Sequence, residues 1–174
     1  VLADFPRGSV QRVDVTDPAA VRPLVREADV VVSLLPANLT PGIARLAIES
    51  KIPLVNTSYV SPELRELDGA ARAAGVLLLA ETGLDPGYDH MTAIREIQRV
   101  NMRGGVVTKL LSGAGGLPAP ECNNDPWGYK FSWFPRAVIL AARQPARFLR
   151  NREVVDIPGP ELFDRHWPFA VEGA

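Results

Sequence analysis

Apolar positions along the first half of the chain follow two alternating patterns, which predict strands and helices in succession. Short, nearly continuous apolar runs are typical of parallel strands, and apolar residues spaced three or four positions apart indicate helices that pack on a sheet. Strands are predicted at 10–15, 30–35, 53–57 and 76–80. Each run is followed by a polar residue and a proline, a pair that favours a helix start. These pairs are Asp17-Pro18, Thr40-Pro41, Ser61-Pro62 and Asp85-Pro86. Short connections between alternating strands and helices predict right-handed crossovers and an α/β fold with a parallel sheet.

The pattern changes after residue 105. It predicts a strand at 106–112, a loop rich in Gly, Pro and Asn at 113–128, a helix at 137–143 and a hairpin at 147–158 that turns at Asn151-Arg152. We therefore divide the chain into two domains. Residues 1–84 are predicted to form a partial Rossmann-like dinucleotide-binding domain with helices on both faces of its parallel sheet. Residues 85–174 are predicted to form a linking helix and the start of a second, α+β substrate domain.

Both ends of the sequence suggest part of a longer protein. Residues 1–8 contain neither a start methionine nor the basic and apolar regions of a signal peptide, and residues 167–174 end on a predicted strand with nothing to pair it. The Gly-x-Gly-x-x-Gly turn that opens a complete dinucleotide-binding unit is also absent. We expect a fragment that lacks its first βαβ glycine turn and is inactive alone.

Charge and composition narrow the range of partners. The 19 basic and 20 acidic residues leave a formal net charge of -1 and are scattered, which does not favour nucleic acid as a partner. No apolar stretch approaches the roughly 18 to 20 residues of a membrane span. The single cysteine, Cys122, cannot form an intrachain disulfide. We expect a cytoplasmic protein with a small-molecule substrate and no nucleic-acid or membrane partner.

Three polar turns, at 36–40, 57–61 and 81–89, follow the predicted strands at one edge of the sheet. Small molecules bind at the carboxyl ends of the strands in open α/β sheets. The Thr, Ser and Asp residues of these turns would also serve as simple helix caps, and spacing alone leaves both interpretations open. Tyr59 lies between two serines and offers a hydroxyl group that a cap does not need.

A metal site is a further reading of the third turn, because Asp85, Asp89 and His90 could share a helix face. Asp85 is better explained as an N-cap, and no further ligand lies nearby in the sequence. His90 is better explained as a packed or hydrogen-bonded histidine than as a catalyst. We therefore predict no metal.

The order and spacing of five segments give a more specific signal than any one motif. The segments are Ser33-Leu34-Leu35-Pro36, Thr57-Ser58-Tyr59-Val60-Ser61-Pro62, Gly83-Leu84-Asp85-Pro86-Gly87-Tyr88-Asp89-His90, Gly115-Gly116-Leu117-Pro118-Ala119-Pro120-Glu121 and Gly128-Tyr129-Lys130-Phe131-Ser132-Trp133. Together they closely resemble saccharopine reductase, the NADP-dependent, glutamate-forming saccharopine dehydrogenase family. Residues 158–162 extend the resemblance toward the end of the chain.

The resemblance implies an oxidoreductase acting on CH–NH bonds, which interconverts saccharopine with glutamate plus 2-aminoadipate 6-semialdehyde in lysine biosynthesis and uses NADP(H). The positions that approach the cofactor in that family match Asp14, Val15, Leu35, Thr57, Leu84 and Asp85. Those that contact the amino-acid substrate match Ser58, Tyr59 and Asp85. Asp85 and Tyr59 are the candidate catalytic residues: ionised Asp85 would stabilise a positive iminium, and Tyr59 would hydrogen-bond the amine or a carboxylate of the substrate. The residues themselves do not distinguish NADP from NAD, and they leave a homodimer open.

Two other functions stay open. A related carboxynorspermidine-type dehydrogenase would keep the fold and act on a carboxylated polyamine, whereas a non-catalytic dinucleotide-binding or oligomerisation module would bind without turnover. The chain also departs from the family at two points that bear on the substrate. Gly113-Ala114 replaces a Tyr-Cys pair, which removes a thiol, and Phe134-Pro135 replaces a serine-containing pair.

Overall fold

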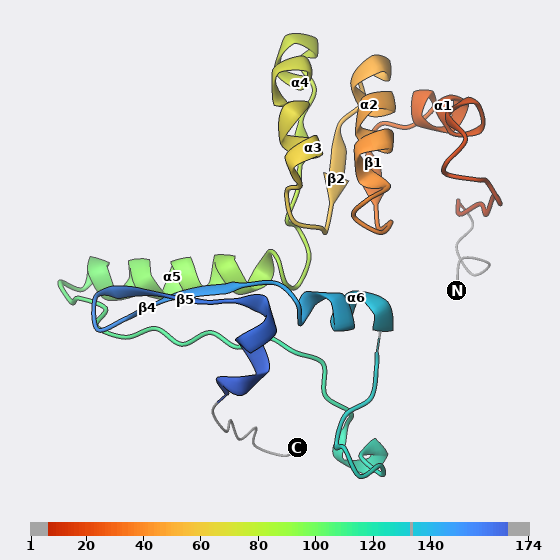
Figure 1. Ribbon diagram of the computed structural model, residues 1–174. Coiled ribbons are helices and arrows are strands. Elements are labelled where there is room, and N and C mark those ends of the chain that lie inside the picture. The colour runs from red at the N-terminus through yellow and green to blue at the C-terminus, as the bar shows by residue number, and fades with distance from the viewer. Residues whose placement is uncertain (1–6, 133, 167–174) are drawn as a thin grey trace. The chain divides into compact units, whose positions relative to one another are not determined.

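The computed structural model describes residues 7–132 and 134–166 (Figure 1). The expected strand at 167–174 and the aromatic Trp133 lie outside the described residues, as do residues 1–6. The chain forms two compact units that divide between Ala114 and Gly115. The domain boundary that the sequence suggests, at residue 84, falls inside the first unit and stays a prediction.

The first unit contains a parallel sheet of three short strands. The strands are β1 (Val31–Ser33), β2 (Leu54–Asn56) and β3 (Leu78–Leu79), in the order β1-β2-β3. Each lies within a predicted strand, so the α/β class with a parallel sheet is confirmed. Val32 pairs with Val55 and Val55 with Leu79, which places the three side chains on one face. On that face Val32 is 60% exposed and Leu79 44% exposed.

The helices of the first unit are α1 (Pro18–Arg26), α2 (Thr40–Ser50), α3 (Pro62–Glu66), α4 (Asp68–Ala74) and α5 (Tyr88–Met102). The predicted caps at Asp17 and Ser61 are confirmed, because their side chains accept the backbone N–H groups of Ala19 and Leu64. The predicted cap at Thr40 is wrong. Thr40 is already helical, and its buried hydroxyl has no hydrogen-bond partner among the described residues.

The predicted helix start at Asp85-Pro86 is also wrong. This peptide bond is cis, and α5 begins at Tyr88, directly after Gly87. Gly83 N–H donates to Pro86 O and Tyr88 N–H donates to Gly83 O, both at 2.9 Å, so residues 83–88 form a closed loop. Gly87 has φ +145°, and a Cβ there would lie 2.4 Å from Gly83 O. The loop therefore needs glycine at this position and ends before the helix starts.

Two predicted strands are absent from the described residues. At 10–15, Asp14 accepts hydrogen bonds from the backbone N–H and the hydroxyl of Thr16, and Asp17 N–H donates to Asp14 O. These local hydrogen bonds form a turn, and the backbone does not pair with a neighbouring strand as predicted. At 106–112 no strand pairing forms, and the apolar side chains Val106 and Leu111 are 82% and 59% exposed.

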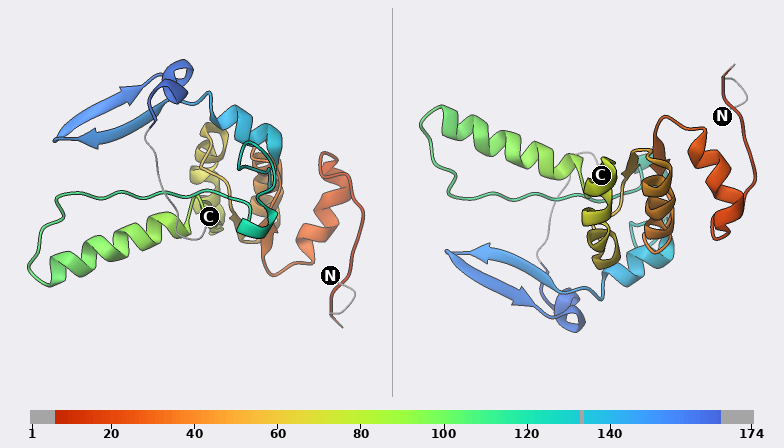
Figure 2. Two further views of the ribbon diagram at one scale, coloured as in Figure 1. Left: turned by 90° about the horizontal axis from the view of Figure 1, so that it is seen from below. Right: turned by 90° about the horizontal axis from the view of Figure 1, so that it is seen from above.

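The second unit contains α6 (Pro135–Ala141), the short 3-10 segments η2 (Pro120–Cys122) and η3 (Gly159–Asp164), and a hairpin of β4 (Ala146–Arg150) and β5 (Glu153–Ile157) (Figure 2). The predicted hairpin is confirmed, and it turns at Asn151 and Arg152, which both have positive φ. None of the helices described is long and apolar enough to cross a membrane.

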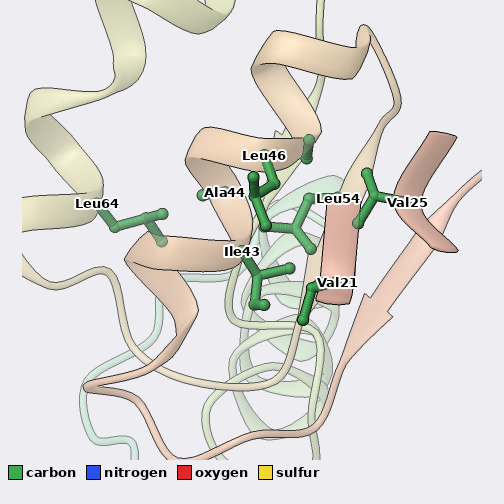
Figure 3. Packing of buried hydrophobic residues seen from close by; sticks show 8 residues of the cluster. Val21, Val25, Ile43, Ala44, Leu46, Leu54 and Leu64 are labelled. Carbon is green, nitrogen blue, oxygen red and sulfur yellow. The ribbon is translucent and has the colours of Figure 1, made fainter. Parts of the chain in front are cut away.

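The core of the first unit lies between α1, α2 and the sheet (Figure 3). Its buried residues are Val21, Val25, Ile43, Ala44, Leu46, Ala47, Leu54 and Leu64. Leu54 is 1% exposed and belongs to the central strand, so it contacts this cluster from the sheet side. The core therefore fixes β2, whose carboxyl end carries the second polar turn.

Replacing Leu54 by Ala should lower the free energy of unfolding by about 2 to 5 kcal/mol, because the surrounding side chains fill only part of the cavity. Urea unfolding followed by circular dichroism measures the loss. Leu79→Ala on β3 is the matched control, since Leu79 is 44% exposed and its loss should cost less. Equal losses for the two variants would contradict this description of the core.

Candidate active site

The carboxyl ends of β2 and β3 carry two turns that hydrogen bonds tie together. Asn56 ends β2 and is 2% exposed. Its side-chain oxygen accepts the N–H of Ser58 at 2.8 Å. Its backbone carbonyl accepts both the N–H of Thr82, at 3.1 Å, and the hydroxyl of Thr82, at 2.8 Å. One buried residue thus orders the turn that it begins and the turn after the neighbouring strand.

Tyr59 and Asp85 meet across these two turns. The Tyr59 hydroxyl donates a hydrogen bond to Asp85 Oδ1 at 2.7 Å. The interpretation of Asp85 as a helix cap is wrong, because Gly87 precedes α5 and it is Asp89 whose carboxylate accepts the Gly87 N–H. The Asp85 carboxylate does not cap the helix, and its oxygens can accept hydrogen bonds at the carboxyl edge of the sheet.

The Asp85 carboxylate strengthens the preference of the Tyr59 phenol for its neutral form. The hydrogen bond to Asp85 raises the pKa of Tyr59 to about 12, with smaller contributions from burial and from the negative charges nearby. A carboxylate favours the neutral phenol, since ionisation would place a second negative charge beside it. Tyr59, like any tyrosine, is neutral at pH 7, and the shift extends the pH range in which it acts as a donor to Asp85.

Glu81 adds a second link between the two turns. Its N–H donates to Ser58 O and its Oε1 accepts the N–H of Val60, both at 3.1 Å. Sequence reasoning did not select Glu81 or Asn56 for the site. A polar residue at the end of an apolar strand was a usable signal for Asn56, since a buried amide needs partners. No local pattern indicates that Glu81 contacts a residue 21 positions earlier.

His90 lies at the start of α5, where its Nδ1 is 2.7 Å from Asp89 Oδ1. This hydrogen bond and the charge of Asp89 raise the pKa of His90 above its ordinary value. His90 is therefore hydrogen-bonded, as expected. Within residues 7–132 and 134–166, no group of three or more His, Cys, Asp or Glu side chains gathers as metal ligands do.

The residues expected near the cofactor lie in three places. Thr57 and Leu84 flank the Tyr59–Asp85 pair in sequence, and a Cβ on Gly83 would lie 3.2 Å from the Thr57 Cβ, so the two turns are in close contact. Leu35 packs against the hydrophobic core. Asp14 and Val15 belong to the turn before α1, where the hydrogen bonds from Thr16 lower the pKa of Asp14.

A cavity of about 530 Å³ lies beside Val15. Its walls include Ala37, Asn38 and Arg45 from the region of α2, and Ser61 and Glu63 from the start of α3. It therefore extends along the strand edge from the turn before α1 to the turn after β2. Of the residues expected near the cofactor, Val15 lines this cavity, whereas Asp14, Leu35, Thr57, Leu84 and Asp85 do not.

Comparison with known proteins shows relatives over nearly the whole chain. The saccharopine dehydrogenase (NADP(+), L-glutamate-forming) of Pyricularia oryzae is 45% identical over 158 residues, which are 91% of this chain and 35% of that protein. The enzyme of the same name from Schizosaccharomyces pombe is 41% identical, over 96% of this chain and 37% of that protein. The alpha-aminoadipic semialdehyde synthase of Arabidopsis thaliana is 41% identical, over 92% of this chain and 15% of that protein. The chain thus spans about a third of the length of these fungal relatives.

A solved structure and two family models agree with these relatives. The apo histidine-tagged saccharopine dehydrogenase (L-Glu forming) from Saccharomyces cerevisiae superposes with a TM-score of 0.79 at 40% identity, over 91% of this chain and 36% of that chain. Residues 4–79 match the saccharopine dehydrogenase NADP binding domain. Residues 83–173 match the saccharopine dehydrogenase C-terminal domain. The chain therefore belongs to the saccharopine dehydrogenase family.

Proposed function

We propose that this chain supplies part of the active site of an NADP(H)-dependent saccharopine reductase. The reaction condenses the amino group of glutamate with 2-aminoadipate 6-semialdehyde, releases water, and reduces the resulting C=N bond to give saccharopine; the reverse uses the same steps. The observation that carries the proposal is the Tyr59–Asp85 hydrogen bond at the strand edge of a chain of this family. Because the chain spans about a third of its fungal relatives, the proposal concerns the residues that it contributes.

The described residues fit a dinucleotide cofactor. A cavity of about 530 Å³ is in the size range of small-molecule sites, and exposed Arg45 on its wall offers a cation that suits a phosphate. We propose that Asp14 and Val15 hold one part of NADP(H), and that Leu35, Thr57 and Leu84 approach another. When bound, NADP(H) supplies the hydride for the C=N carbon.

Tyr59 and Asp85 would act on the substrate nitrogen. A protonated C=N bond carries positive charge, and a fixed carboxylate beside it stabilises that charge without first having to reorient. Tyr59 keeps its proton on Oη, so it can move its hydrogen bond from Asp85 to the amine or a carboxylate of the substrate. Ser58, half-buried beside Tyr59, is the third proposed substrate contact. The pair thus orients the substrate and stabilises charge.

We also propose a cytoplasmic location. Cys122 is an exposed free cysteine, and free thiols persist in reducing compartments. A homodimer is the assembly that we propose to test by light scattering of the full-length protein.

Replacing Asp85 by Asn should lower kcat of the full-length protein at least tenfold, a barrier increase above about 1.4 kcal/mol, because the amide keeps the shape and loses the charge. The assay follows NADPH formation from saccharopine. Asp68→Asn is the matched control, since Asp68 is an exposed carboxylate paired with Arg72 on α4, and its kcat should not change. Unchanged turnover in Asp85→Asn would remove Asp85 from the chemistry. Turnover of carboxynorspermidine and not of saccharopine would assign the site to the polyamine reaction.

The Asp85→Asn substitution should also lower the pKa of Tyr59 from about 12 toward the ordinary phenol value of about 10, because the charge that opposes the phenolate is gone. Phenolate absorbance after a rapid pH jump measures this pKa before the protein unfolds. Subtracting the signal of the Tyr59→Phe variant removes the contributions of Tyr88 and Tyr129. A Tyr59 pKa that stays the same in Asp85→Asn would refute the hydrogen bond as its cause.

A further inference from the structure

Glu81 holds the peptide groups on both sides of Tyr59. Its N–H donates to Ser58 O, which belongs to the peptide unit before Tyr59, at 3.1 Å. Its side-chain Oε1 accepts the N–H of Val60, which belongs to the peptide unit after Tyr59, also at 3.1 Å. Since each peptide unit is planar, holding both units fixes φ and ψ of Tyr59 and hence the direction of its Cα–Cβ bond.

Packing does little to hold Tyr59 in place. The residue is 60% exposed, so contacts with neighbouring side chains cover less than half of its surface. A phenol on such a turn has several rotamers available, and the turn itself could change conformation. The hydrogen bonds from Glu81 are the described interactions that fix the backbone at this point.

Glu81 also belongs to the segment that carries Asp85. The hydroxyl of Thr82, the next residue, is bonded to the buried strand end at Asn56 O, and Gly83 N–H closes the following loop on Pro86 O. Residues 81–86 are therefore fixed with respect to β2. A side chain from this segment that holds the backbone of Tyr59 sets the distance between the phenol and the Asp85 carboxylate.

The backbone of Glu81 supports a role for its side chain. Glu81 has φ +59°, in the left-handed region where a Cβ is unfavourable and glycine is not. Glycine would satisfy the turn more easily and would still provide the N–H for Ser58. Only a side chain with an acceptor at its end can provide the bond to Val60.

We infer that Glu81 is a positioning residue, which aims the Tyr59 hydroxyl at Asp85 by holding the backbone on both sides of the tyrosine. The inference rests on the proposed function, because it assigns a role within that site. Glu81 does not need to contact substrate or cofactor for this role. It acts through Tyr59.

Two substitutions of Glu81 separate the effect of its hydrogen bond to Val60 N–H from the effect of its negative charge. The charge of Glu81 itself contributes to the high pKa of Tyr59, so any neutral residue lowers that pKa somewhat. Glu81→Gln removes the charge and keeps an oxygen acceptor for Val60 N–H, whereas Glu81→Ala removes both. Comparing the two variants in the full-length protein therefore isolates the role of the acceptor.

We expect Glu81→Ala to lower the pKa of Tyr59 from about 12 toward about 10, as Asp85→Asn does, and Glu81→Gln to lower it much less. The phenolate absorbance measurement described above reports this pKa and does not depend on turnover. Equal shifts in the two variants, or no shift in Glu81→Ala, would overturn the inference. If Glu81→Ala does not fold, Glu81→Gly replaces it with the same expectation, since glycine adopts the left-handed conformation readily.

Turnover provides the second readout. Glu81→Ala should lower kcat for saccharopine at least tenfold. In the Tyr59→Phe background it should have almost no further effect, because both substitutions disrupt the same interaction, the hydrogen bond from Tyr59 to Asp85. Additive losses would overturn the inference. Should the pKa shifts appear as expected while the unsubstituted protein does not turn over saccharopine, the positioning role stands and the proposed function fails.

Discussion

The candidate site depends on the buried amide of Asn56. This residue places a polar side chain at the end of the central strand, where it is 2% exposed and where an unpaired amide would be costly. Its side-chain oxygen accepts the Ser58 N–H on one turn, and its backbone carbonyl accepts the Thr82 hydroxyl on the other. The carboxyl ends of β2 and β3 are thereby held in one arrangement, and Tyr59 and Asp85 come to lie within hydrogen-bond distance.

The core and the site are connected through the same strand. Leu54 on β2 is 1% exposed and is anchored in the hydrophobic cluster between α1, α2 and the sheet, two residues before Asn56. β3 contributes just two residues to the parallel sheet. The turn that follows β3 therefore relies on hydrogen bonds from Thr82 and Glu81 as much as on the strand ladder. Packing in the core therefore fixes the turn after β2, and hydrogen bonds fix the turn after β3 to it.

Much of this arrangement could be predicted from the sequence. Apolar runs separated by polar-plus-proline pairs gave the three strands of the sheet and the starts of two helices, because both signals are local and act over a few residues. The parallel order then places the turns after β2 and β3 at one edge, which predicts that Tyr59 and Asp85 lie close together. The hairpin was predictable for the same reason, since Asn151 tolerates a left-handed backbone and lies between two strand-like runs.

The rest could not be read from local patterns. Asp85-Pro86 has the composition of a helix start, but the loop that closes on Gly83 and requires Gly87 takes that position instead. Residues 10–15 have the composition of a strand, yet a strand exists only where a neighbour pairs with it, and here Asp14 forms a turn with Thr16. The bond from Glu81 to Val60 joins positions 21 residues apart, which makes it a product of the fold. A phenol with a pKa of about 12 remains a hydrogen-bond donor in alkaline solution, where an ordinary tyrosine is already ionised, so the contact that Tyr59 makes tolerates a more basic medium than an unpaired phenol would.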